Sequence, residues 1–200
     1  MNIINAARDL LIKQDITSFE LDILRIKSDK KIIFDTFSGY AQATGTPVIT
    51  KSEIKDGCTI IKGDIHIILT HDNYAHFYNS GNPGRSLWTL AHEVGHVMLN
   101  HTKDDESEER QANRFARELL MPECIILELN RRLKRNLRAE EISRLFGVSQ
   151  SAAANRLKQI YCRNIFSAYL KEEIIEKYDK LIVRYVKKSK KILSPLVYGE

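Results

Sequence analysis

The spacing of apolar residues predicts helices at the start of the chain. Residues 2–13 carry apolar side chains at helical intervals. A second helix is predicted from Thr17, because Glu20 follows three residues later in a capping-box pattern and apolar positions continue to Ile26.

The next part of the chain predicts strands. Lys31–Phe37 is rich in Ile and Phe and predicts a strand, whereas residues 39–47 predict a loop or a short helical piece. Two Ile-rich runs, 58–62 and 65–70, are separated only by Gly63-Asp64. This spacing indicates a β-hairpin.

After a polar loop at residues 71–85, the pattern is helical almost to the end. The predicted helices are Ser86–Asn100, Glu106–Met121, Glu123–Leu133, Glu140–Phe146, Gln150–Ile160 and Phe166–Leu193. The chain is therefore expected to be α+β, with a small N-terminal mixed β-sheet followed by an all-helical C-terminal part.

The charge distribution divides the chain. The 200 residues carry a net charge of +5. Residues 1–130 hold 14 basic and 19 acidic residues, and residues 131–200 hold 17 basic and 7 acidic ones. We therefore predict an N-terminal domain over 1–130 and a basic helical subdomain over 131–200. A basic segment of this kind favours contact with nucleic acid, a membrane surface or an acidic partner.

Composition excludes several classes of protein. With 43% hydrophobic residues the chain can bury a core, yet no apolar run approaches the roughly 18 to 20 residues that span a bilayer. The first ten residues lack the pattern of a signal peptide. Three widely spaced cysteines suggest neither a disulfide framework nor a thiolate zinc site. We expect a cytoplasmic protein without membrane contact.

The residues His92-Glu93-Val94-Gly95-His96 form an HExxH motif. Two histidines four positions apart on a helix lie about 40° apart in azimuth and about 6 Å apart along the axis, so both can reach one metal ion. The apolar residues of this predicted helix fall on its opposite side, as the helical wheel shows. The motif therefore predicts two zinc ligands, with Glu93 as the general base.

A catalytic zinc needs a third protein ligand, and the next predicted helix offers Glu106, Glu108 and Glu109. Ala112 and Ala116 lie on the inward stripe of that helix and would let the two helices approach closely. Both Glu108 and Glu109 border the stripe. Helical periodicity does not choose between them.

The segment from Leu87 to His101, followed by Glu109–Pro122, resembles the ImmA/IrrE family of zinc metallopeptidases. The strong resemblance covers about residues 85–122, and a weaker one continues through 145–157. It implies a zincin-like helix pair, zinc held by His92, His96 and Glu109, and Glu93 as the base.

The resemblance also implies a function. Such proteins cleave or relieve a helix-turn-helix repressor, often in a mobile element or a stress response. We therefore expect a zinc-dependent metalloendopeptidase that cleaves a protein substrate site-specifically and so regulates transcription. The alternative is a DNA- or protein-binding regulator whose zinc site is mainly structural; the intact Glu93 favours the enzyme.

Several residues near the motif have two interpretations. Asn113 lies one turn beyond Glu109 and is either a second-shell partner of the metal site or a packing residue. His101 follows His96 so closely that we expect a structural or surface residue. Residues 65–70 either form a sheet edge that binds an extended substrate or are fully paired in a hairpin. Candidate oxyanion donors lie in the preceding loop: His71, Tyr74, His76 and Tyr78.

Residues 140–160 resemble a helix-turn-helix, with Gly147 at the turn and Ser149 as a candidate N-cap. Its second helix could contact DNA weakly, but packing or partner binding is the favoured role. The predicted helix 166–193 ends in a cluster of lysines, which suits a solvated basic face. The alternatives are contact with a phosphate backbone or with an acidic protein partner.

Overall fold

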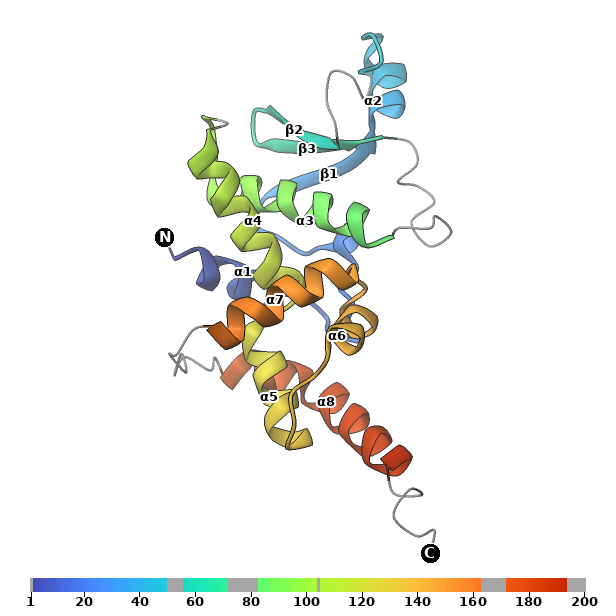
Figure 1. The fold of residues 1–200 in the computed structure, drawn as a ribbon. Coiled ribbons are helices and arrows are strands. Elements are labelled where there is room, and N and C mark those ends of the chain that lie inside the picture. Colours follow the sequence, from blue (N-terminus) through green and yellow to red (C-terminus); the bar gives the residue numbers. More distant parts are fainter. Residues whose placement is uncertain (1, 50–55, 72–82, 104, 163–171, 194–200) are drawn as a thin grey trace, which may run out of the picture.

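A three-stranded mixed sheet lies over a helix at one end of the structure, and further helices extend away from it (Figure 1). This computed structural model describes residues 2–49, 56–71, 83–103, 105–162 and 172–193. The combination of a mixed sheet and helices confirms the α+β class that the sequence predicted.

The sheet consists of β1 (Lys31–Thr36), β2 (Gly57–Lys62) and β3 (Ile65–Thr70), in the order β1-β3-β2. β2 and β3 pair antiparallel, as the predicted hairpin requires, and Gly63 turns the chain at a φ of 61°. β1 pairs with β3 in parallel. Of the two alternatives for residues 65–70, the fully paired strand is confirmed: β3 is hydrogen-bonded on both sides, and β1 and β2 are the edge strands of the described sheet.

The first helix, α1 (Ile3–Ile12), begins where the sequence predicted, capped by the side chain of Asn2. The helix predicted from Thr17 does not form; only a short 3₁₀ turn, η1 (Ile23–Arg25), is present. The backbone N–H of Glu20 donates to the hydroxyl of Ser18 instead, which is a local turn that competes with helix formation.

The other helices follow the predicted pattern closely. They are α2 (Phe37–Thr44), α3 (Pro83–Leu99), α4 (Glu106–Leu120), α5 (Glu123–Leu133), α6 (Ala139–Phe146), α7 (Gln150–Cys162) and α8 (Glu172–Leu193). The short helical piece expected near residues 39–47 is α2. The predicted last helix began at Phe166, and its first residues lie outside the described part of the chain. No helix in the described ranges has the length and apolarity that crossing a membrane requires.

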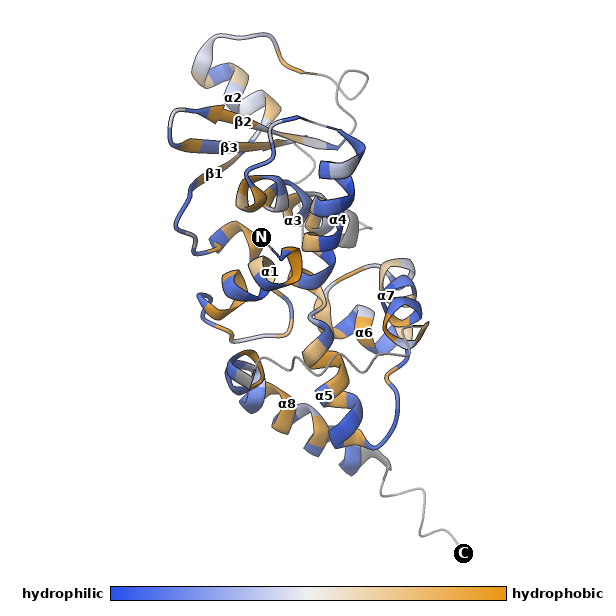
Figure 2. Ribbon diagram, turned by 90° about the vertical axis from the view of Figure 1, so that its left-hand side faces the viewer, coloured by the Kyte–Doolittle hydropathy of each residue, from blue (hydrophilic) through white to orange (hydrophobic). Residues whose placement is uncertain are grey.

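Helix α3 packs against the sheet on one side and against α4 on the other. The buried apolar residues form one cluster that runs from α1 through α3 and α4 to α7 and α8. Figure 2 shows the same alternation of hydrophobic and hydrophilic residues around the helices of both halves. The cluster therefore draws on residues before and after position 130, and the division into two domains stays a prediction.

A buried ion cluster also joins the two halves. Glu118 of α4 is 1% exposed and accepts a hydrogen bond from Nε of Arg8 at 2.7 Å. Its other carboxylate oxygen pairs with the guanidinium of Arg156 from α7. Arg156 also donates to the carbonyl oxygen of Met121 at 3.0 Å. Because each buried charge has an oppositely charged partner, these contacts fix α7 against the helix that carries Glu109.

Candidate metal centre

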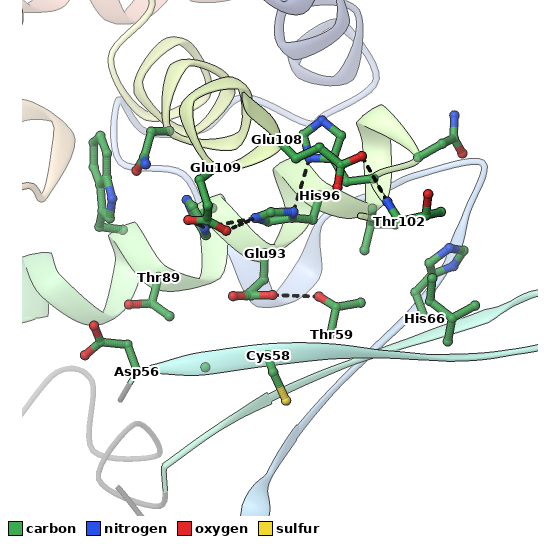
Figure 3. Close-up of a pocket in the computed structure, with 18 residues that line it drawn as sticks. Asp56, Cys58, Thr59, His66, Thr89, Glu93, His96, Thr102, Glu108 and Glu109 are labelled. Carbon is green, nitrogen blue, oxygen red and sulfur yellow. Dashed lines mark hydrogen bonds and ion pairs between the residues drawn. The ribbon is translucent and has the colours of Figure 1, made fainter. Parts of the chain in front are cut away.

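Three side chains from α3 and α4 converge on one point (Figure 3). Nε2 of His92 lies 3.0 Å from Nε2 of His96. The carboxylate oxygens of Glu109 lie 3.3 Å from Nε2 of His92 and 3.1 Å from Nε2 of His96. All three donors are of the kind that binds zinc.

These distances fit a metal ion. Tetrahedral zinc with bonds near 2.0–2.1 Å separates its ligand atoms by roughly 3.3 Å. Burial lowers the pKa of His92, although Glu109 and Asn113 act in the opposite direction. A lowered pKa favours the neutral imidazole, which is the form that binds a metal. The donor set and its spacing therefore suit zinc.

Close packing of α3 against α4 brings the donors together. Gly95 lies between the two histidines, where a Cβ atom would meet the backbone Cα and O atoms of Ala112 and the ring of Phe115, each at 3.2 Å. Ala112 is fully buried at this contact. The close approach thus depends on a glycine inside the motif as well as on the alanine opposite, and sequence reasoning identified only the alanine.

Glu108 and Glu109 have different environments. Glu108 accepts hydrogen bonds from the backbone N–H groups of Thr102 and Lys103, at 3.1 and 2.7 Å. It thereby closes the loop between α3 and α4, whereas Glu109 points at the histidines. The structure therefore distinguishes Glu109 from Glu108, which helical periodicity could not do.

Glu93 projects from α3 toward the sheet and is 8% exposed. Its Oε2 accepts a hydrogen bond of 2.8 Å from the hydroxyl of Thr59 on β2 (Figure 3). Neighbouring Cys58 points to the other face of the strand, and burial together with Glu93 raises the pKa of its thiol to about 11. A metal-free thiol with this pKa stays protonated near neutral pH, and Cys58 does not belong to the cluster of converging donors.

Two polar residues lie next to the histidines. Asn113 lines the cleft within hydrogen-bonding reach of His92, although Nδ1 of His92 has no hydrogen-bond partner among the described residues, so a supporting role for Asn113 at the metal site stays a prediction. His101 has its Nδ1 atom 3.1 Å from Nδ1 of His96. The expectation that His101 is only a structural or surface residue therefore missed a contact with a candidate ligand.

The end of α3 explains how His101 reaches His96. Asn100 has a φ of 57°, in the left-handed region, and the N–H of His101 donates to the carbonyl of His96 at 3.0 Å. This C-terminal turn folds the chain back over the helix end. A histidine placed just past the predicted end of an HExxH helix, after an asparagine, is the sequence signal that could have indicated the contact.

The site opens into a cleft of about 830 Å³ between α3, α4 and the edge strand β2. Its wall includes Gly57, Thr59 and Ile61 from β2, Trp88 from α3 and Asn113 from α4. Of the four candidate oxyanion donors, the described residues include only His71, which packs on Phe37 with ring centroids 4.7 Å apart and is not part of the described cleft wall. Tyr74, His76 and Tyr78 lie outside the described residues.

Helices α6 and α7 meet at Gly147, whose φ of 66° makes the tight turn that the sequence predicted. Arg156, the cation nearest the middle of α7, is buried in the ion cluster with Glu118. The exposed positions of α7 include Asn155 and Lys158. The surface of α7 is therefore less basic than its sequence suggests.

Residues 65–158 match the model of a known protein family. The model of the peptidase M78 family, described as the IrrE N-terminal-like domain, matches residues 65–158. This range contains the three converging side chains, Glu93, α6 and most of α7. A comparison with curated proteins found no match.

Proposed function

Because residues 65–158 carry an IrrE N-terminal-like domain of the peptidase M78 family, we propose that this protein is a zinc-dependent metalloendopeptidase. The observation that carries the proposal is the convergence of His92, His96 and Glu109 within 3.3 Å of one another, with Glu93 on the same helix. In this proposal the first three residues hold the zinc and Glu93 is the catalytic base.

Zinc bound at this site would act as a Lewis acid that polarises a peptide carbonyl and makes water easier to deprotonate. Glu93 accepts the proton of the attacking water on its carboxylate and then delivers it to the leaving amine. His92, His96 and Glu109 keep their places because α3 and α4 are packed at Gly95. His101 orients the imidazole of His96 from the Nδ1 side, and Asn113 lies beside His92 in the wall of the cleft.

The substrate segment would bind in an extended conformation along β2. This strand is the sheet edge beside the cleft, and Thr59 at its middle contacts Glu93. An edge strand offers unpaired backbone groups, which an extended peptide can satisfy by strand addition. The proposal thus moves substrate binding from residues 65–70, which was one of the two alternatives that the sequence left open, to β2.

We propose a helix-turn-helix repressor as the substrate, as the ImmA/IrrE resemblance implies. The basic C-terminal part would then dock a protein partner rather than read DNA. The burial of Arg156 supports this choice, since it removes a cation from the surface of α7. Direct DNA contact would be weak and limited to phosphate groups.

The test combines metal analysis with a cleavage assay. Bound zinc is measured by elemental analysis, and the protein is incubated with the repressor encoded beside it. Wild type is expected to bind one zinc and to produce discrete fragments. Glu93→Gln should keep the zinc and lose cleavage, because only the base is removed. Cleavage that persists in Glu93→Gln would contradict the mechanism.

The same assay addresses the alternative, a regulator with a structural zinc. Such sites normally complete the tetrahedron with a fourth protein ligand, and among the described residues the cluster has only three. Zinc binding without cleavage, together with repressor or DNA binding that Glu93→Gln leaves unchanged, would favour this alternative. The salt dependence of any DNA binding would show whether phosphates are contacted.

A further inference from the structure

The hydrogen bond between Thr59 and Glu93 joins the edge strand to the candidate base. Thr59 lies at the middle of β2, where its Cα pairs with that of fully buried Ile68 on the central strand. A β-branched side chain on a paired strand has few χ1 choices, so the hydroxyl is held in place by the sheet. The Thr59 hydroxyl donates a hydrogen bond to Oε2 of Glu93 at 2.8 Å.

The side chain of Glu93 has more conformational freedom than that of Thr59. A glutamate side chain has three rotatable bonds, and ordering it costs conformational entropy. Its position on α3 fixes the backbone but not the carboxylate. A donor on a second, rigid element therefore limits the directions in which the carboxylate can turn, and a small error in the placing of a base lowers the rate strongly.

We propose that Thr59 is a positioning residue that fixes the direction of the Glu93 carboxylate within the cleft that both residues share with the candidate metal ligands. The inference rests on the proposed peptidase function, but its geometric part concerns only Thr59 and Glu93. Thr59 touches neither zinc nor the scissile bond in this proposal and acts through Glu93. Because it also belongs to the strand proposed to bind substrate, it ties the base to the wall along which the substrate lies.

Three variants test whether the hydroxyl of Thr59, and not its shape or its place in the strand, positions Glu93. Thr59→Val keeps the shape and the strand preference but removes the donor. Thr59→Ser keeps the donor and removes a methyl group. Thr70→Val makes the same change at a buried threonine of β3 that is not part of the described cleft wall, so it serves as the matched control.

The expected results differ for each variant. Thr59→Val should lower kcat about 10- to 100-fold, with KM within about twofold of wild type, unchanged zinc content and an unchanged melting temperature. Thr59→Ser should recover most of kcat, and Thr70→Val should match wild type. Equal activity of Thr59→Val and wild type would overturn the proposal, as would equal losses in Thr59→Val and Thr59→Ser.

Crystal structures of metal-free wild type, Thr59→Val and Thr59→Ser give a readout that does not depend on activity. The Glu93 carboxylate should keep its orientation in wild type and Thr59→Ser and turn away in Thr59→Val. An unmoved carboxylate in Thr59→Val would overturn the proposal even if kcat falls. Should wild type cleave no repressor, the peptidase function fails, and these structures still decide the role of Thr59.

Discussion

Nδ1 of His101 lies 3.1 Å from Nδ1 of His96, on the side of the imidazole opposite Glu109. If His96 binds a metal through Nε2, its Nδ1 must carry the proton and donate it to His101. His101 then accepts through Nδ1 and carries its own proton on Nε2. One contact thereby sets the tautomers of two rings.

Replacing His101 should weaken zinc binding. His101→Phe removes the acceptor for His96, and loss of a partner of this kind costs roughly 10- to 100-fold in metal affinity. Competition with a chromogenic chelator measures the zinc Kd. His66→Gln is the control, since His66 lines the same cleft but does not belong to the metal cluster. An equal loss in both variants would show a general effect on the cleft.

Variants of Glu108 and Glu109 should differ in the amount of zinc that the protein binds. Glu109→Gln removes a charged ligand and should abolish stoichiometric zinc binding, with little change in the stability of the metal-free protein. Glu108→Gln should retain zinc but weaken the two backbone hydrogen bonds at Thr102 and Lys103, lowering the free energy of unfolding by about 1 kcal/mol. Elemental analysis and urea unfolding measure the two effects. The opposite pattern would reassign the third ligand to Glu108.

The direction in which Gly95→Ala changes the free energy of unfolding tests how closely α3 and α4 approach. In an exposed helix this change stabilises by up to about 1 kcal/mol. Here the new Cβ would press on the backbone of Ala112 at 3.2 Å, and overpacking should instead lower the free energy of unfolding by about 1–3 kcal/mol. Zinc affinity should fall as well, because α4 carries Glu109. A more stable Gly95→Ala variant would show that the two helices do not approach this closely.

Glu141 on α6 is expected to make the free energy of unfolding depend on pH in the acidic range. Two hydrogen bonds from the Arg135 guanidinium, at 2.9 and 2.7 Å, lower the pKa of Glu141 to about 2. Because the folded-state pKa lies below that of the unfolded chain, this stabilisation is present above about pH 4.5 and is lost as pH falls toward 2. We expect it to be worth about 1–2 kcal/mol after allowance for solvent.

Urea unfolding of wild type and Glu141→Gln between pH 7 and pH 2.5 measures this contribution. The difference between the two proteins should be largest near neutral pH and should shrink below about pH 4. Glu140→Gln is the matched control, because the neighbouring Glu140 is exposed. A difference that stays constant across this range would mean that the Arg135–Glu141 pair does not titrate as described.

Local pattern predicted most of the elements. Helical periodicity placed α3 and α4 within a few residues, and the Gly63-Asp64 turn placed the β2–β3 hairpin. These elements depend on neighbouring residues along the chain, so the sequence carries their signal directly. The capping pattern at Thr17 failed because the Ser18 hydroxyl offered the backbone another local partner, which a motif match does not weigh.

By itself, the sequence placed two histidines and Glu93 together on one helix as the candidate metal ligands and base. An i, i+4 spacing on a helix places His92 and His96 on one face whatever surrounds it. Only the tertiary structure distinguished Glu109 from Glu108, brought Thr59 and His101 into the site, made β2 the edge strand and buried Arg156. These features depend on contacts between segments that are distant in sequence or on the path of a loop. Helical periodicity describes one element at a time and does not specify which elements meet.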